Sequence, residues 1–250
     1  MKIAAGGLVS SMLPIQTAGV TAVRNDIEYF AYSEAKGTGE DKKRTTEQIS
    51  RWSISGADIV KKHPWYPDII CEMETGRGCP RLRHCSFCSE GLAGSVEFRE
   101  TEDIINEIDS LIKCGVKRFR IGRQADIIQY KSRMRDFRGD FPAPNPAAVK
   151  ELFHQLKVRR DNGSIEVLNI DNGNPGSIVN WPDESASILS SIADAITPGD
   201  TLPFGVESFD ISVIKQNCLK TTPEETIFAV KMINDICGQT VDGIPLLLPG

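Results

Sequence analysis

The feature that most constrains the fold is a regular alternation of short apolar strands with amphipathic helices, beginning near residue 68. The predicted strands cover residues 68–73, 116–121, 165–170, 201–206 and 244–248. The predicted helices between them cover residues 101–114, a segment that opens at 145, and residues 183–196 and 222–237. This alternation predicts parallel strands joined by right-handed crossovers.

Local signals support the helices. In the segment 101–114, five apolar side chains recur at helical spacing and share one face: Ile104, Ile105, Ile108, Leu111 and Ile112. Asn145-Pro146 pairs a cap residue with proline at the first helical position. Thr222-Pro223-Glu224-Glu225 has the spacing of a capping box. The helices therefore have predictable beginnings.

The fold class expected from this order is α/β, a partial (βα) TIM-type barrel of parallel strands. The barrel is expected to be truncated after its fifth strand, because Pro249-Gly250 follows that strand directly. Residues 33–50 are almost wholly polar and predict a linker or mobile loop. We therefore expect an extension and linker over 1–50 and the barrel over 51–250. The chemistry of such a fold is expected just after the strands.

Composition limits the class of protein. The net charge of −5 argues against coating nucleic acid by bulk electrostatics. No run of 18 uncharged apolar residues predicts a membrane span, and the first residues lack a secretory pattern. The seven cysteines are an odd number, and four of them lie within 18 residues, from Cys71 to Cys88. We therefore expect a cytoplasmic protein whose cysteines bind metal or do redox chemistry.

The cysteine cluster follows the first predicted strand. Cys79, Cys85 and Cys88 have the spacing Cys-x5-Cys-x2-Cys. Three thiolates can hold three irons of a [4Fe–4S] cluster and leave the fourth iron open. A structural zinc site with Cys71 or His84 as fourth ligand fits the spacing equally well. The position of the loop after a strand of an α/β array favours the cluster.

Here the sequence resembles the radical S-adenosylmethionine (radical SAM) superfamily over about residues 65–250. The resemblance rests on the cysteine loop, on Phe87 just before the last cysteine, and on the βα units that follow. A second resemblance is the stretch Leu202-Pro203-Phe204-Gly205-Val206-Glu207-Ser208-Phe209-Asp210. It is similar to the fourth strand of the methylthiotransferase, coproporphyrinogen-oxidase and cobalamin-dependent branches.

The resemblance implies an Fe–S enzyme that uses a [4Fe–4S] cluster and S-adenosylmethionine (SAM). Cys79, Cys85 and Cys88 would ligate iron, and reductive cleavage of SAM would give a 5′-deoxyadenosyl radical. A low-potential donor, ferredoxin or flavodoxin, would supply the electron. Methyl or methylthio transfer is the reaction suggested by the branch. The substrate is not identified, and neither a zinc-stabilised binding module nor an inactive fragment of a larger enzyme is excluded.

Two departures from the family pattern stand out. The commonest family spacing is Cys-x3-Cys-x2-Cys, so this loop has two extra residues. Where the family often has Gly-Gly-Glu, this chain has Arg120-Ile121-Gly122-Arg123-Gln124-Ala125-Asp126. Either Gln124 or Asp126 could accept the amine hydrogens of SAM. The cofactor-binding residues expected from strand ends and from the resemblance are Phe87, Gly122, Gln124, Asn169, Asp171, Glu207 and Ser208.

Two other features have competing interpretations. Asn172 and Asn174 follow the third strand, where they suit either ligand contact or a plain turn. A basic patch precedes Phe141 and contains Lys131, Arg133, Arg135 and Arg138. It could meet an anionic substrate such as tRNA, although a solvated loop explains it more simply.

Overall fold

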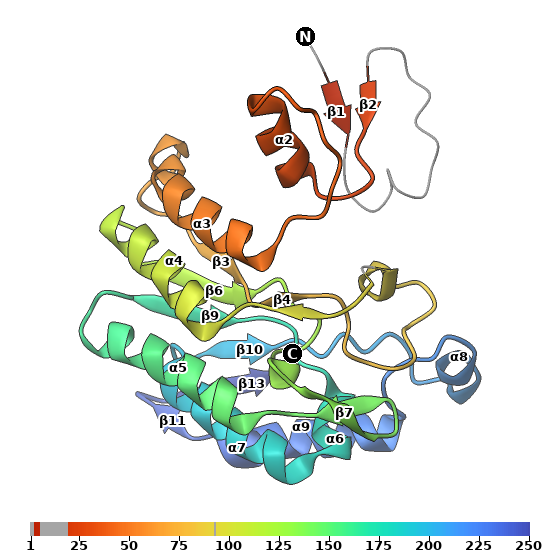
Figure 1. Ribbon diagram of the computed structural model, residues 1–250. Coiled ribbons are helices and arrows are strands. Elements are labelled where there is room, and N and C mark those ends of the chain that lie inside the picture. Colours follow the sequence, from red (N-terminus) through yellow and green to blue (C-terminus); the bar gives the residue numbers. More distant parts are fainter. Residues whose placement is uncertain (1–2, 6–19, 93) are drawn as a thin grey trace. The chain divides into compact units, whose positions relative to one another are not determined.

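The computed structural model describes residues 3–5, 20–92 and 94–250 (Figure 1). Two compact units divide the chain, Met1–Ser53 and Ile54–Gly250. No helix among the described residues has the length and apolar character needed to cross a membrane.

The first unit contains a parallel strand pair and helical segments. Its elements are β1 (Ile3–Ala5), β2 (Val20–Ala22), α2 (Ile27–Ala35) and the beginning of α3 (Thr46–Gly56). The prediction of a linker over 33–50 was wrong at both ends, because α2 continues to Ala35 and α3 begins at Thr46. A reciprocal cap starts α3: Thr45 N donates to Gln48 Oε1 at 2.8 Å, and Gln48 N donates to Thr45 Oγ1 at 3.1 Å.

The second unit is built on parallel strands. β3 (Cys71–Glu74), β6 (Arg118–Gly122) and β9 (Val167–Ile170) form a three-stranded parallel sheet in the order β3-β6-β9. β10 (Asp200–Leu202) pairs in parallel with β13 (Leu247–Pro249), and β10 lies beside β9. The mixed α/β class with parallel strands is therefore confirmed.

Four helices lie side by side along the strands in chain order (Figure 1). They are α4 (Thr101–Lys113), α5 (Pro146–Asp161), α7 (Pro182–Ala195) and α9 (Pro223–Cys237). Asn145 caps α5 by accepting from Ala148 N at 3.3 Å, and the capping box of α9 is formed by Thr222 and Glu225. Both predicted helix starts are confirmed, because each depends on residues within one turn.

Shorter elements complete the unit. They are η1 (Ala57–Lys62), β4 (Gly76–Arg77), η2 (Ser89–Leu92), β5 (Glu97–Phe98), η3 (Ile127–Gln129), β7 (Arg133–Arg138), β8 (Phe141–Ala143), α6 (Pro175–Asn180), α8 (Ile211–Gln216), β11 (Thr240–Val241) and β12 (Ile244–Pro245).

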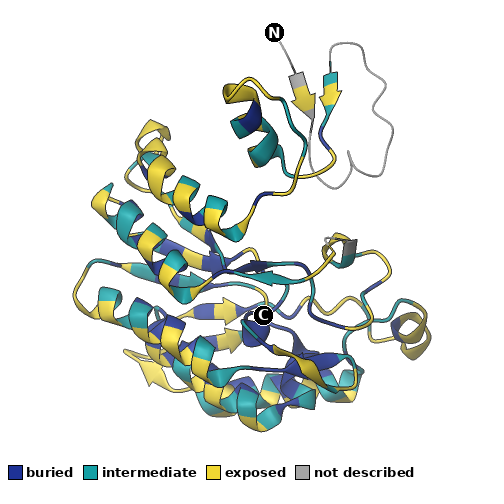
Figure 2. Ribbon diagram, viewed as in Figure 1, coloured by how far each residue is buried: buried dark blue, intermediate teal, exposed yellow. Residues whose placement is uncertain are grey.

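The core lies between the strands and the helices, as the dark blue segments of Figure 2 show. Along β6, Phe119 and Ile121 are fully buried, whereas Arg120 between them is exposed. Glu72 and Asn169 are the neighbours of Arg120 in register on β3 and β9. Because side chains alternate across a sheet, one face is apolar and packed while the other is polar.

Two predicted strands differ from those observed. The fourth was expected over 201–206, but β10 ends at Leu202. Phe204 N still donates to Gly250 O at 2.9 Å, and the φ of +56° at Gly205 then ends the extended chain. The fifth was expected over 244–248 and is divided into β12 and β13. β12 pairs with β11 around Asp242-Gly243, an Asp-Gly sequence typical of tight hairpins.

Candidate functional site

The cysteine loop connects the two strands of a small hairpin. β4 follows β3 and pairs antiparallel with β5 through Gly76–Phe98 and Arg77–Glu97. All three cysteines of the motif lie between these two strands, at the carboxyl end of β3. The hairpin therefore fixes both ends of the loop beside the strand ends of the parallel sheet.

Within the loop, Cys85 is buried, and Cys79 and Cys88 are half-buried. Cys88 N donates to Cys85 O at 3.1 Å, so the Cys-x2-Cys segment is a turn. Burial raises the pKa of the Cys79 thiol, and the nearby Cys88 adds to this rise while Arg81 opposes it. In the described part of the chain, no three His, Cys, Asp or Glu side chains are grouped as metal ligands.

The loop is tied to two distant segments. Leu82 N donates to Asp140 O at 2.9 Å, in the turn between β7 and β8. Ser86 N donates to Asn217 O at 3.1 Å, and Ser86 Oγ donates to Asn217 Oδ1 at 2.6 Å. The segment after α8 and the β7–β8 hairpin therefore hold the loop between them.

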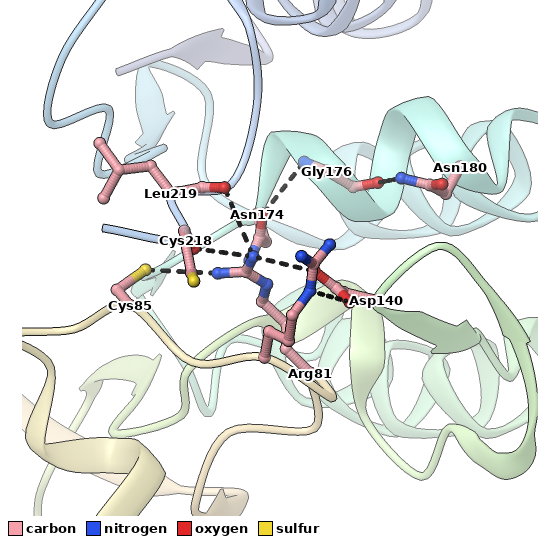
Figure 3. A network of polar contacts seen from close by, with 9 residues as sticks. Arg81, Cys85, Asp140, Asn174, Gly176, Asn180, Cys218 and Leu219 are labelled. Atoms are coloured by element: carbon pink, nitrogen blue, oxygen red, sulfur yellow. Dashed lines mark hydrogen bonds and ion pairs between the residues drawn. The ribbon is translucent and has the colours of Figure 1, made fainter. Parts of the chain in front are cut away.

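Arg81 lies at the centre of these contacts (Figure 3). Its Nη1 donates to Cys85 Sγ at 3.3 Å, and its Nη2 donates to Cys218 O at 3.1 Å and to Leu219 O at 3.5 Å. Its guanidinium carbon lies 5.0 Å from the centre of the Phe141 ring. Two of these partners, the main-chain oxygens of Cys218 and Leu219, lie more than 130 residues away, so no local sequence signal points to them.

A pocket opens beside Cys85. Its lining consists of Cys85, Gly205, Val206, Glu207, Ser208, Leu219, Lys220 and Thr221. Glycine is favoured at position 205, because its φ of +56° lies in the left-handed region. Glu207 and Ser208 were predicted at the end of a strand, but they lie in irregular chain after β10. The structure nevertheless brings both residues together with Cys85.

Gln124 joins the carboxyl ends of three strands. Its Oε1 accepts from Thr75 Oγ1 at 3.1 Å, just after β3. Its Nε2 donates to Ile121 O at 3.2 Å and to Asp171 O at 2.7 Å, in β6 and just after β9. Both donor hydrogens are thereby engaged within the protein, and the amide oxygen keeps one free lone pair.

The other predicted strand-end residues lie close to Gln124 or beside β10. Gly122 ends β6, where a side chain would meet Glu72 Oε1 at 2.5 Å. Asp171 Oδ2 lies 3.4 Å from Arg120 Nη2. Asn169 hydrogen-bonds the Asp200 carboxylate on β10. Phe87, by contrast, is 61% exposed.

Asp126, the alternative to Gln124, is a buried carboxylate. Its Oδ1 accepts from Ile128 N at 3.0 Å and from Asn174 N at 3.1 Å, and its Oδ2 accepts from Ser177 Oγ at 2.6 Å. Burial raises the pKa of Asp126 to about 7, although these hydrogen bonds and the charge of Lys220 act in the opposite direction. Asp126 is thus a proton-binding group in the neutral pH range that lies near the pocket lysine.

The asparagines after the third strand serve the local fold. Asn172 has φ 56°, and its Nδ2 donates to Gln124 O at 3.0 Å. Asn174 caps α6 by accepting from Gly176 N at 3.0 Å. In the basic patch, Arg138 stacks 4.0 Å from the centre of the Trp181 ring, and Lys131 pairs with Glu100. These contacts account for two of the basic side chains without an external ligand.

No family model matches the chain. An uncharacterized protein of Methanocaldococcus jannaschii is 44% identical over 211 residues, which cover 83% of this chain and 38% of that protein. An uncharacterized protein of Archaeoglobus fulgidus is 40% identical over 203 residues, covering 81% and 37%. A putative methylthiotransferase of M. jannaschii is 25% identical over 202 residues, covering 79% and 36%. The chain thus spans less than two fifths of these curated relatives.

A solved structure resembles nearly the whole chain. It is that of the cobalamin-dependent S-adenosylmethionine radical enzyme OxsB with aqua-cobalamin and S-adenosylmethionine bound. The TM-score is 0.63 at 18% sequence identity, and the match covers 93% of this chain and 34% of OxsB. The chain has an OxsB-like fold. The radical SAM resemblance inferred from the sequence is supported at the level of this fold.

Proposed function

We propose that this chain is the SAM-cleaving part of a radical SAM enzyme. The observation that carries the proposal is the position of Cys79, Cys85 and Cys88 in one hairpin loop at the carboxyl end of β3, within an OxsB-like fold. Parallel α/β folds place their chemistry at this end of the strands. We further propose that the strands β3, β6, β9, β10 and β13 are part of a TIM-type barrel.

The donor set fits a [4Fe–4S] cluster, since such clusters are held by cysteine thiolates. Cys79, Cys85 and Cys88 would hold it, and the Arg81 guanidinium would offset part of the added negative charge. When bound, the cluster supplies the electron for reductive cleavage of SAM to a 5′-deoxyadenosyl radical. Because the three thiols are not grouped in the described structure, the proposal requires them to draw together when iron is supplied.

The pocket beside Cys85 has a volume of about 10 Å³, enough for about one water molecule, so we propose that its lining forms one edge of the SAM site. Glu207 and Ser208 offer acceptors for its amine and ribose hydroxyl groups, and Lys220 offers a cation for its carboxylate. Gln124, Asn169 and Asp171 add polar groups at the strand ends. Gly122 is proposed to contribute its main chain, since the Glu72 side chain fills the space beside it. Phe87 is proposed to cover the adenine, where its exposed ring would lose contact with water.

The reaction beyond SAM cleavage is proposed at a coarser level. Methyl or methylthio transfer is supported by the similarity to a putative methylthiotransferase. A low-potential ferredoxin or flavodoxin is the proposed electron donor. The transfer reaction and the electron donor are proposals about the whole protein, since the chain spans only 38% of one relative and 37% of another.

Anaerobic reconstitution tests the proposal. The expected product is a brown protein with about four irons and four sulfides per chain. Reduction in the presence of SAM should then release 5′-deoxyadenosine, measured by liquid chromatography. About one equivalent of zinc with no SAM cleavage would instead select the zinc-stabilised binding module. Cluster assembly without SAM cleavage would identify this chain as an inactive fragment of a larger enzyme.

A further inference from the structure

We propose that Arg81 is the positioning residue of the cysteine loop: its guanidinium holds Cys85 as an iron ligand and raises the reduction potential of the bound cluster. The inference rests on the proposed function, because it assigns Cys85 to a cluster. It concerns one contact, the 3.3 Å hydrogen bond from Arg81 Nη1 to Cys85 Sγ (Figure 3).

The first argument is the burial of the guanidinium. The side chain of Arg81 is 3% exposed, and a buried charge is costly unless it is paired and hydrogen-bonded. Its Nε has no hydrogen-bond partner among the described residues. The two carbonyl oxygens that accept from Nη2 are neutral. Apart from a long ion pair with Asp140, Arg81 therefore makes no hydrogen bond to an anionic group.

The nearest carboxylate forms an ion pair with Arg81 but no hydrogen bond. Asp140 Oδ2 lies 3.7 Å from Arg81 Nη2, beyond hydrogen-bond distance. Both oxygens of Asp140 instead accept from Arg83 Nε, at 2.9 and 3.0 Å. Asp140 is thus engaged by an arginine whose side chain is 72% exposed. An iron-bound Cys85 thiolate would give Arg81 a hydrogen-bonded anionic partner.

The second argument is that Arg81 connects the cysteine loop to a distant segment of the chain. Through Cys218 O and Leu219 O it fixes Cys85 to the segment that also lines the pocket. Ser86 reinforces this connection through its two hydrogen bonds to Asn217. The same guanidinium therefore orients the sulfur of Cys85 and one edge of the proposed SAM site.

The electrostatic consequence has a definite sign. Reduction makes the cluster more negative, so a buried cation bonded to a ligand sulfur stabilises the reduced form. Removing that cation should shift the reduction equilibrium about tenfold toward the oxidised form. For one electron, this corresponds to a fall of about 60 mV in midpoint potential.

Three variants test the inference: R81M, R81K and R83M, each reconstituted anaerobically beside the wild type. Midpoint potentials are measured by titration followed by electron paramagnetic resonance, and iron is counted for each protein. We expect R81M to lose iron and to lower the potential of the clusters that remain. R81K keeps the charge and should lie between R81M and the wild type. R83M removes an exposed arginine of the same loop and should keep the wild-type potential.

Each outcome decides a different point. Wild-type potentials in R81M and R81K would overturn the inference and leave Arg81 a purely structural side chain. If R81M does not fold, the R81K potential alone decides. An equal fall in R83M would also overturn it, because the effect would then be one of general charge. A wild type that binds no iron would overturn the proposed function itself, and the inference with it.

Discussion

The main-chain nitrogen of Ile170 donates a hydrogen bond to Asp200 Oδ2 at 2.7 Å. Ile170 ends β9, and Asp200 begins β10. β9 and β10 are assigned to different sheets, yet they lie side by side. A carboxylate thus takes the place of a main-chain acceptor where the two sheets meet. Burial raises the pKa of Asp200, whereas the bonds from Ile170 and Asn169 lower it.

We predict that Asp200→Ala lowers the free energy of unfolding by about 1–3 kcal/mol. The substitution leaves the buried N–H of Ile170 without its acceptor, and no neighbouring strand replaces it. Chemical denaturation of the metal-free protein measures the change. The matched control is Asp194→Ala on α7, whose aspartate is 69% exposed and pairs with Lys157. An exposed pair is worth about 0–1 kcal/mol, so equal losses would contradict the role given to Asp200.

The raised pKa of Asp126 predicts an unusual pH dependence of the free energy of unfolding. Its pKa is raised to about 7 in the folded protein, so the folded state binds this proton more tightly than the unfolded state does. Its contribution is fully present below about pH 4 and is lost as the pH rises through 7. The loss is on the order of 4 kcal/mol. In Asp126→Asn this component should disappear, and unfolding curves between pH 5 and 8 should show a flatter slope.

Ser177→Ala supplies the complementary test of Asp126. Ser177 Oγ donates to Asp126 Oδ2, and that bond favours the charged carboxylate. Its removal should raise the pKa further, so the loss of stability should extend to higher pH. Asp126→Asn with the slope of the wild type would show that another group titrates in this range.

The helices α4, α5, α7 and α9 could be predicted because their signals are local. Asn145-Pro146 and Thr222-Pro223 each contain a cap residue followed directly by proline, which is typical of the first helical position. Asn174-Pro175 carries the same signal and begins α6, but a turn explained it equally well because no apolar repeat follows.

The candidate site was only partly predictable. The places of the cysteine loop, Glu207 and Ser208 after strands could be predicted, whereas the β4–β5 hairpin around the loop was not expected. The interaction of Arg81 with Cys218 has no local signal, since it spans 137 residues. Gln124 was predicted to face a ligand, but its two distant partners, Thr75 and Asp171, depend on the register of three strands. Sequence periodicity locates a strand end and leaves open which side chains meet there.

Gln124 is predicted to stabilise the fold as well as to bind SAM. Gln124→Glu replaces the donating Nε2 by an acceptor that faces the carbonyl oxygens of Ile121 and Asp171. We expect a loss of about 1–3 kcal/mol in unfolding free energy, because the hydrogen bonds become repulsive contacts. The same change at Gln155 on α5, which is only half-buried, should cost less. Similar losses of unfolding free energy at both positions would contradict the role given to Gln124 at the junction of the three strands.

The ligand assignment predicts different results for two cysteines of the same unit. Cys85→Ala should abolish the bound iron, because it removes one of three thiols in the hairpin loop. Cys114 is the C-cap residue of α4, and Tyr66 Oη donates to its main-chain oxygen at 2.7 Å, a bond that alanine retains. Cys114→Ala should therefore keep the iron content of the wild type.

Cys88→Ala separates ligation from folding. Cys88 is half-buried, and Arg81 bonds Cys85 rather than Cys88, so its loss leaves the contacts of Arg81 intact. We expect Cys88→Ala to unfold near the wild-type denaturant concentration in the metal-free form and still to bind no complete cluster. Iron and sulfide analysis beside denaturant unfolding distinguishes the two effects. If Cys88→Ala assembled the wild-type amount of iron, the third ligand would have to come from another thiol, because a cluster held by Cys79 and Cys85 alone would lack a third anchor.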